Sequence, residues 1–160
     1  MDFDVRQATR DDGETLLDLW HGFTAHLSEY DERYGHEDTA DERWISYFEN
    51  QLLDSKYGTV IVAEADDEPV GVLEARVMGN HPLFRLENHG KIHGLYVAEE
   101  YRGHGIASAL FDGAVEWLTE PPREVDFYRI TAIEGDDDAE EVYRANGCAP
   151  VEHIYEKRFD

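Results

Sequence analysis

A glycine-rich loop, RGHGIA at residues 102–107, stands between an apolar run and a segment with helical periodicity. The first N–H groups of a helix have no partner within it, and the helix dipole adds about half a positive charge there, so this position suits a phosphate. Gly103 and Gly105 allow a tight turn and a close approach of the backbone to an oxygen. Arg102 adds a charge-assisted contact. The spacing predicts an anion-binding loop at the start of a helix.

Three other interpretations of the loop stay open. A nucleotide-binding P-loop requires Gly-Lys-Ser/Thr, and no lysine stands near. A dinucleotide fingerprint would use Gly103, Gly105 and Ser108 with Asp126, but that acid lies at the beginning of the following strand, whereas the ribose-binding acid belongs at its end. In the third interpretation the glycines serve only a structural turn.

The chain is strongly acidic, with 37 Asp and Glu against 14 Lys and Arg and a formal net charge of -23. Acid spread along the chain, with lysine only at 56, 91 and 157, is typical of proteins from the salt-loaded cytoplasm of a halophile. The alternative is an acidic face that recruits a cationic substrate or partner. In molar salt the Debye length is about 3 Å, so distant carboxylates hardly oppose an anion at the loop. Nucleic acid is excluded as a partner on charge grounds.

Length and composition predict one folded domain over residues 1–160, since 41% of the residues are apolar and 12% aromatic. Cys148 is the single cysteine, which excludes an intramolecular disulfide and a cysteine metal cluster. His21 and His26, five residues apart, do not share a helix face, so no metal site is expected. Without a long apolar run or a leader segment, we expect a cytoplasmic protein that has no membrane partner.

Hydrophobic patterning predicts the elements that position the loop. Alternation indicates strands at 3–8, 91–97, 125–132 and 152–159 and a hairpin at 58–78. Helical spacing indicates helices at 11–30, 39–55, 105–119 and 138–147. This order predicts an α/β fold with a mixed, mostly antiparallel central sheet and helices on both faces.

The stretch IHGLYVAEEYRGHGIA, residues 92–107, resembles the central motif of the GNAT superfamily of N-acetyltransferases. That motif is an apolar-x-x-Leu-x-Val strand followed by an Arg/Gln-x-x-Gly-x-Gly/Ala loop. The opening VRQATRDD, the hairpin and the segment DDDAEEVYRANG at 136–147 are similar to the family in the same order, so the resemblance covers nearly the whole chain.

The resemblance implies acetyl-CoA as co-substrate, with its pyrophosphate on the loop amides and its pantetheine arm paired with the preceding strand like an added strand. The residues implied to contact it are Leu95, Tyr96, Val97, Arg102, Gly103, His104, Gly105, Ile106, Ala107 and Asp136. Asp136 stands where family members commonly carry a cofactor-contacting Asn. Cys148 replaces the usual aromatic after the glycine and is expected to be a small core side chain.

The resemblance also implies direct transfer of an acetyl group to a primary amine. Tyr143 stands where family members place a tyrosine that donates a proton to the thiolate of CoA, and a phenol with an ordinary pKa of about 10 is protonated at neutral pH. A core aromatic is the alternative. A bound ammonium must first lose a proton, for which His93, with an ordinary pKa near 6.5, is the first candidate base unless it is only structural. Glu74 is the second candidate.

Choice of the acceptor, in this family, depends on the first two helices, the loop between them and the segment before the motif strand, here 79–90. The residues in the first of these regions are His21, His26, Glu29, Tyr30, Asp31, Glu32 and Tyr34. They would either cradle a cationic acceptor, whether a small amine or a protein lysine or N-terminus, or form a solvated face. A non-catalytic acyl-CoA-binding or sensor domain is the rival function. A homodimer is implied by the family alone.

Overall fold

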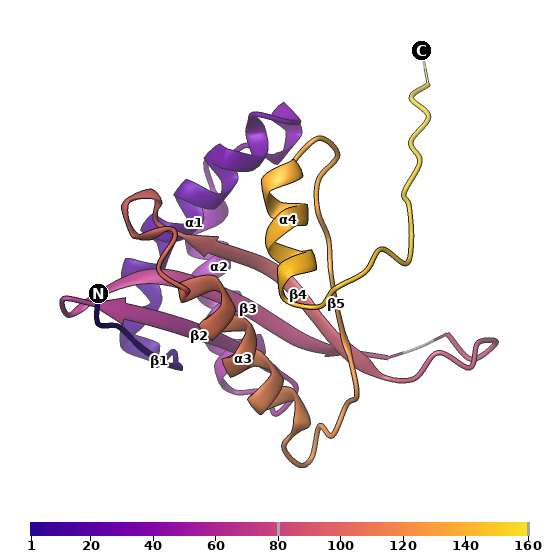
Figure 1. Cartoon of the computed structure of the whole chain (residues 1–160), viewed down its shortest axis with the longest axis horizontal. Coiled ribbons are helices and arrows are strands. Elements are labelled where there is room, and N and C mark those ends of the chain that lie inside the picture. Colours follow the sequence, from indigo (N-terminus) through magenta and orange to yellow (C-terminus); the bar gives the residue numbers. More distant parts are fainter. Residues whose placement is uncertain (80, 160) are drawn as a thin grey trace.

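The computed structural model describes residues 1–79 and 81–159, so that Asn80, in the predicted acceptor segment, and Asp160 lie outside the described residues. One five-stranded sheet has its strands in chain order: β1 (Asp4–Gln7), β2 (Gly58–Ala65), β3 (Glu68–Met78), β4 (His89–Val97) and β5 (Tyr128–Ile130). The first four strands pair antiparallel, and β5 pairs parallel with β4 (Figure 1). The predicted mixed, mostly antiparallel sheet is confirmed.

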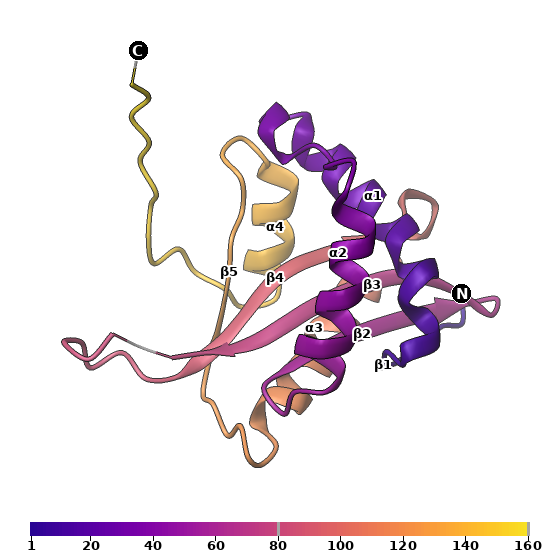
Figure 2. The same cartoon turned by 180° about the vertical axis from the view of Figure 1, so that it is seen from behind.

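Helices cover both faces of the sheet, as predicted. They are α1 (Gly13–Ser28), α2 (Ala40–Tyr47), α3 (Ile106–Thr119) and α4 (Asp137–Ala145), with 3-10 turns at Arg10–Asp12, Glu32–Tyr34 and Glu99–Tyr101 and a π-helical turn at Phe48–Leu53. Figures 1 and 2 show α1 and α2 on one face and α3 and α4 on the other.

The alternation of strand residues divides the core into two layers. Val60 and Val62 are fully buried in the layer under α1, together with Phe48 of the π-helical turn. Ile61, between them, points to the opposite face and packs with Leu110 of α3. Because successive side chains of a strand point to opposite faces, one apolar strand supplies both layers.

Strand β4 contains an irregularity within the predicted motif, at its second residue. Glu74 is opposite Gly94 and Ala75 is opposite Ile92, so His93 is an additional residue with no partner on β3. A β-bulge of this kind bends the strand and changes the direction of a side chain. Ile92 and Gly94 each have a paired residue on β3, whereas His93 has none, so its side chain does not follow the regular alternation of the strand.

Two elements differ in extent from their predictions. The predicted helix 39–55 begins where expected, but its second half widens into the π-helical turn Phe48–Leu53. The predicted strand 125–132 pairs only over Tyr128–Ile130, because β5 diverges from β4 beyond that point.

The predicted strand 152–159 is wrong. The segment forms no regular secondary structure and runs away from the sheet at the C-terminal end (Figures 1 and 2). Ile154 and Tyr155 point to different sides of any strand, yet they are 87% and 90% exposed. Alternation predicts a strand only if a neighbouring strand accepts its hydrogen bonds and one face is covered, and within the described chain neither condition is met.

Candidate active site

A cavity of about 600 Å³ opens where β4 and β5 diverge, and α1, α3 and α4 contribute to its wall. Most of the residues predicted to contact a cofactor line it: Leu95, Tyr96, Val97, Arg102, Gly103, Gly105, Ile106, Ala107 and Asp136. Tyr143 and His93 line it as well. The exception is His104, an exposed loop residue that is not part of this wall.

The glycine loop has the geometry of an anion cradle. Gly103 and Gly105 have φ of +81° and +83°, in the left-handed region that favours glycine. Apart from each glycine and its two chain neighbours, no atom of the described chain lies within 4 Å of where a Cβ would stand, so the space beside the loop is open. Gly105 is the N-cap of α3 and no side chain caps this helix, which leaves the first amides of α3 available to a ligand.

The other side of the cavity offers an unpaired strand edge. Strand β5 pairs with β4 only over Gly90–Ile92, and the cavity begins beyond that point. The backbone of Leu95–Val97 pairs with β3 on one side and faces the cavity on the other. An extended amide-containing chain can add to such an edge with main-chain hydrogen bonds.

Arg102 is held beside the loop. Its Nε donates to the carbonyl oxygen of Val97 at 2.9 Å, and its guanidinium lies over the ring of Tyr96 at 5.4 Å from the centroid. The hydrogen bond to Val97 thus occupies Nε of the guanidinium, and the ring of Tyr96 covers one of its faces. Its terminal nitrogens remain to contact an anion at the cavity mouth.

Tyr143 stands on α4 in the cavity wall. Its ring meets the edge of Phe111 at 6.2 Å between centroids, and its hydroxyl makes a long 3.4 Å contact as donor to the carbonyl of Thr131. Burial, and secondarily the charge of Asp136, raise the pKa of Tyr143 to about 12. The phenol therefore stays protonated throughout the neutral range, and its long hydrogen bond to Thr131 leaves the proton free to be donated to a ligand in the cavity.

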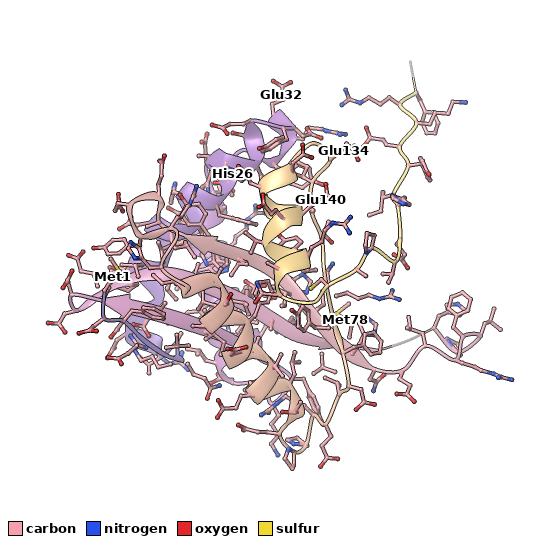
Figure 3. The ribbon with its side chains drawn as sticks, viewed as in Figure 1. Met1, His26, Glu32, Met78, Glu134 and Glu140 are labelled. Carbon is pink, nitrogen blue, oxygen red and sulfur yellow. The ribbon has the colours of Figure 1, made fainter. Side chains whose placement is uncertain are left out.

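Asp136 lines the cavity, but its carboxylate has two partners within the protein. One oxygen accepts from the main-chain N–H of Ala139 and so caps α4, and the other lies 2.7 Å from Nε2 of His26 on α1. Figure 3 shows His26 beside α4. Only 3% of Asp136 is exposed. This residue and His26 join α1 to α4 across the cavity, a role that the sequence did not predict for either.

A second cavity of about 240 Å³ adjoins the first on the α1–α2 side of the sheet. Its wall includes Trp20, Trp44 and Glu74, and three residues line both cavities: Phe23, His93 and Gly94. A Cβ on Gly94 would stand 2.8 Å from the ring of Trp20, which is the physical reason that no side chain occupies this position. His93, the bulged residue, is therefore placed where the two cavities meet.

The two candidate bases differ in their surroundings. Desolvation lowers the pKa of His93 below its ordinary 6.5, and the charges of Lys91 and Arg76 lower it further. Glu74 is 7% exposed and accepts from Nε1 of Trp44 at 3.3 Å and from the hydroxyl of Tyr47 at 3.0 Å. Burial raises its pKa despite these donors. His93 is thus a neutral base at pH 7, whereas Glu74 is a buried, hydrogen-bonded carboxyl.

The predicted acceptor residues do not form one surface. Tyr34 lines the larger cavity with His26, whereas Glu29 and Glu32 are exposed to solvent. Asp31 pairs with Arg33 at 2.6 Å, which holds the pKa of Asp31 low. Sequence reasoning missed Trp44 and Tyr47, whose spacing fits the core side of a helix equally well.

No helix among the described residues is long and apolar enough to cross a membrane.

A model of the acetyltransferase (GNAT) family matches residues 20–148. An uncharacterized N-acetyltransferase of Archaeoglobus fulgidus is 31% identical over 122 residues, which are 76% of this chain and 78% of the relative.

Two solved structures share the fold over nearly the whole chain. One is AAC(6')-Iy in complex with the bisubstrate analogue CoA-S-monomethyl-acetylneamine, with a TM-score of 0.75, 18% identity and coverage of 100% of this chain and 99% of that one. The other is a ribosomal-protein-alanine N-acetyltransferase from Brucella melitensis, with a TM-score of 0.71, 21% identity and coverage of 99% and 100%. The sequence match, the archaeal relative and the shared fold agree, and the chain belongs to the acetyltransferase (GNAT) family of enzymes.

Proposed function

We propose that this enzyme transfers an acetyl group from acetyl-CoA to a primary amine by direct attack in a ternary complex, without a metal in the reaction. The observation that carries the proposal is the meeting of two cavities at His93. The larger cavity offers helix amides and an open strand edge, which fit a pyrophosphate and a pantetheine arm. The smaller one, with Trp44 and Glu74, fits an amine.

In this proposal His93 accepts the proton of the bound ammonium, directly or through water. The pKa of an alkyl ammonium is near 10.4, so exposing its lone pair at pH 7 costs about 4 to 5 kcal/mol. Acetyl-CoA supplies the acetyl group in activated form as a thioester. The amine nitrogen bonds to the acetyl carbon, the carbon–sulfur bond breaks, and Tyr143 gives its proton to the sulfur. As the amide forms, the nitrogen gives its second proton to water, and water returns a proton to the Tyr143 phenolate.

The cofactor assignment is tested by calorimetric titration of acetyl-CoA, and of NADH for comparison, into the protein at low salt and in molar KCl. We expect acetyl-CoA to bind in both conditions, because short-range amide contacts persist where the Debye length is about 3 Å. NADH is expected not to bind. A folded sample that does not bind acetyl-CoA would leave the loop as a structural turn only.

Replacing Gly105 with alanine should weaken acetyl-CoA binding at least about 10-fold, equivalent to about 1.4 kcal/mol. Gly147→Ala is a matched control, since Gly147 also has positive φ (+90°) with no atom within 4 Å of a Cβ, but it is not part of either cavity wall. Both substitutions cost about 1–2 kcal/mol of backbone strain. Equal affinity of the two variants for acetyl-CoA would remove the loop from the binding site.

The acceptor is proposed as a primary amine of a small molecule or of a protein. The structural neighbours include enzymes named for both classes, an aminoglycoside and a ribosomal-protein alanine. A panel of small amines and a set of intact proteins, assayed by mass spectrometry for a gain of one acetyl group, would separate the two.

We further propose that the enzyme acts in a salt-rich cytoplasm. The acidic composition, with a formal net charge of -23, supports this location.

We also propose that the enzyme is a homodimer. The C-terminal segment supports this, because Val151, Ile154, Tyr155 and Phe159 are 68–90% exposed, an unusual set of apolar side chains to leave in water. A second copy of the chain would supply the sheet edge or apolar surface that this segment lacks.

Light scattering should therefore give about twice the 18.4 kDa of one chain, and Ile154→Asp should shift the mass toward the monomer. Leu83→Asp is the control, because Leu83 is an equally exposed apolar residue (82%) far from this segment in the sequence. A wild-type protein that is monomeric at all concentrations would contradict the dimer.

A further inference from the structure

Two histidines and an aspartate converge on the outer side of α1 and α2. His21 lies on α1, His36 in the segment before α2, and Asp41 in the first turn of α2. Nε2 of His36 lies 2.7 Å from Oδ1 of Asp41, and Nε2 of His21 lies 3.1 Å and 3.2 Å from the two Asp41 oxygens. The three potential ligand atoms all lie within 4.8 Å of one another.

The hydrogen bonds of Thr24 assign the tautomer of His36. Oγ1 of Thr24 lies 3.1 Å from the main-chain oxygens of Trp20 and His21, and 3.0 Å from Nδ1 of His36. Carbonyl oxygens only accept, so the single hydroxyl proton is donated to one of them, as is common for threonine within a helix. Oγ1 then accepts from Nδ1–H of His36, and Nε2 is the ring nitrogen that faces Asp41.

The rings of His21 and His36 are stacked, with centroids 3.7 Å apart and planes 19° apart. Two imidazolium ions at this separation would repel each other while sharing the one carboxylate. Because the lone pair of an imidazole lies in the ring plane, the exposed ring of His21 must turn out of the stack for a single cation to bind both nitrogens and the carboxylate. A histidine whose second nitrogen is fixed by a hydrogen bond is the usual arrangement of a metal ligand.

We propose that His21, His36 and Asp41 bind a divalent transition-metal ion, with Zn²⁺ as the best match. Two imidazole nitrogens and one carboxylate oxygen form a three-ligand set that leaves coordination positions for water. The side chains of His21 and Asp41 are 47% and 44% exposed, so an ion can enter from solvent. His36 and Thr24 also line the smaller cavity, so the ion would fix α1 against α2 at its rim.

The test is calorimetric titration of a zinc salt into the metal-free protein, residues 1–160, in about 1 M potassium nitrate, because such salt screens weak attraction to scattered carboxylates but not direct coordination. We expect one equivalent of Zn²⁺ to bind with micromolar affinity. His21→Ala, His36→Ala and Asp41→Asn should each weaken this binding at least about 10-fold. His153→Ala, in the C-terminal segment, should leave it unchanged.

His21→Ala is the decisive variant, since His21 lies at the surface and its loss leaves the fold intact. Wild-type affinity in His21→Ala and His36→Ala, or weak binding to several sites in the wild type, would overturn the proposal. Co²⁺ in place of Zn²⁺ should give visible absorption bands that disappear in His21→Ala. These measurements need neither acetyl-CoA nor an amine, so their outcome is independent of the proposed acetyl transfer.

Discussion

Replacing Tyr143 with phenylalanine is expected to lower kcat by about 10²- to 10⁴-fold, the usual contribution of a positioned proton donor. The substitution removes the hydroxyl that lines the larger cavity and keeps the ring that packs against Phe111. Affinity for acetyl-CoA should hardly change, because the phenol contributes only its proton to the departing sulfur. Steady-state kinetics and calorimetry on the same preparation measure the two quantities separately.

Tyr101→Phe is the control for this substitution, because Tyr101 lines the same cavity and also loses a hydroxyl. We expect it to keep wild-type kcat. An unchanged kcat in Tyr143→Phe would leave Tyr143 as a packing residue of α4. A wild-type protein that binds acetyl-CoA but acetylates no amine would instead favour the acyl-CoA sensor, for which neither substitution has a kinetic consequence.

Replacing His93 with glutamine is expected to lower kcat by about 10²-fold or more and to alter its pH profile. A general base works when it is neutral, so kcat should fall as the pH falls through the pKa of His93. Desolvation and two nearby cations place that pKa below 6.5. The acidic limb of the wild-type profile should therefore lie below pH 6.5, and it should be absent from His93→Gln.

Glu74→Gln separates the two candidate bases. Glu74 lines only the smaller cavity, and its carboxyl is held by Trp44 and Tyr47. If Glu74 contacts the amine and His93 removes its proton, Glu74→Gln should raise KM for the amine and keep the acidic limb. Loss of the limb in Glu74→Gln, with the limb kept in His93→Gln, would exchange the two roles.

The parts of the fold that the sequence predicted well are those with local signals. Gly103 and Gly105 stand between a predicted strand and a predicted helix, which indicates a tight turn, and the structure gives both the positive φ that glycine tolerates. The helical spacing of apolar residues in α1 and α3 likewise indicates the length of each helix. Such signals need no knowledge of what packs nearby.

Features that depend on partners distant in sequence were missed. The bulge at His93 is a shift in register between β4 and β3. The sequence of β4 alone contains no signal for such a shift. The 152–159 segment shows the converse, an alternating pattern whose neighbouring strand is absent from the described chain. His26 is the nearest histidine to His21 in the sequence, whereas the fold places His21 against His36 and Asp41.

In the proposed ternary complex, the common wall of the two cavities would couple the binding of one substrate to the binding of the other. Phe23, His93 and Gly94 face both spaces, and α1, which carries Phe23, is tied to α4 by His26 and Asp136. A ligand that changes the position of α1 therefore changes the free energy of binding on the other side. By thermodynamic reciprocity, the factor by which acetyl-CoA alters affinity for the amine equals the factor by which the amine alters affinity for acetyl-CoA. Titration of either substrate in the presence of the other should therefore give the same coupling factor.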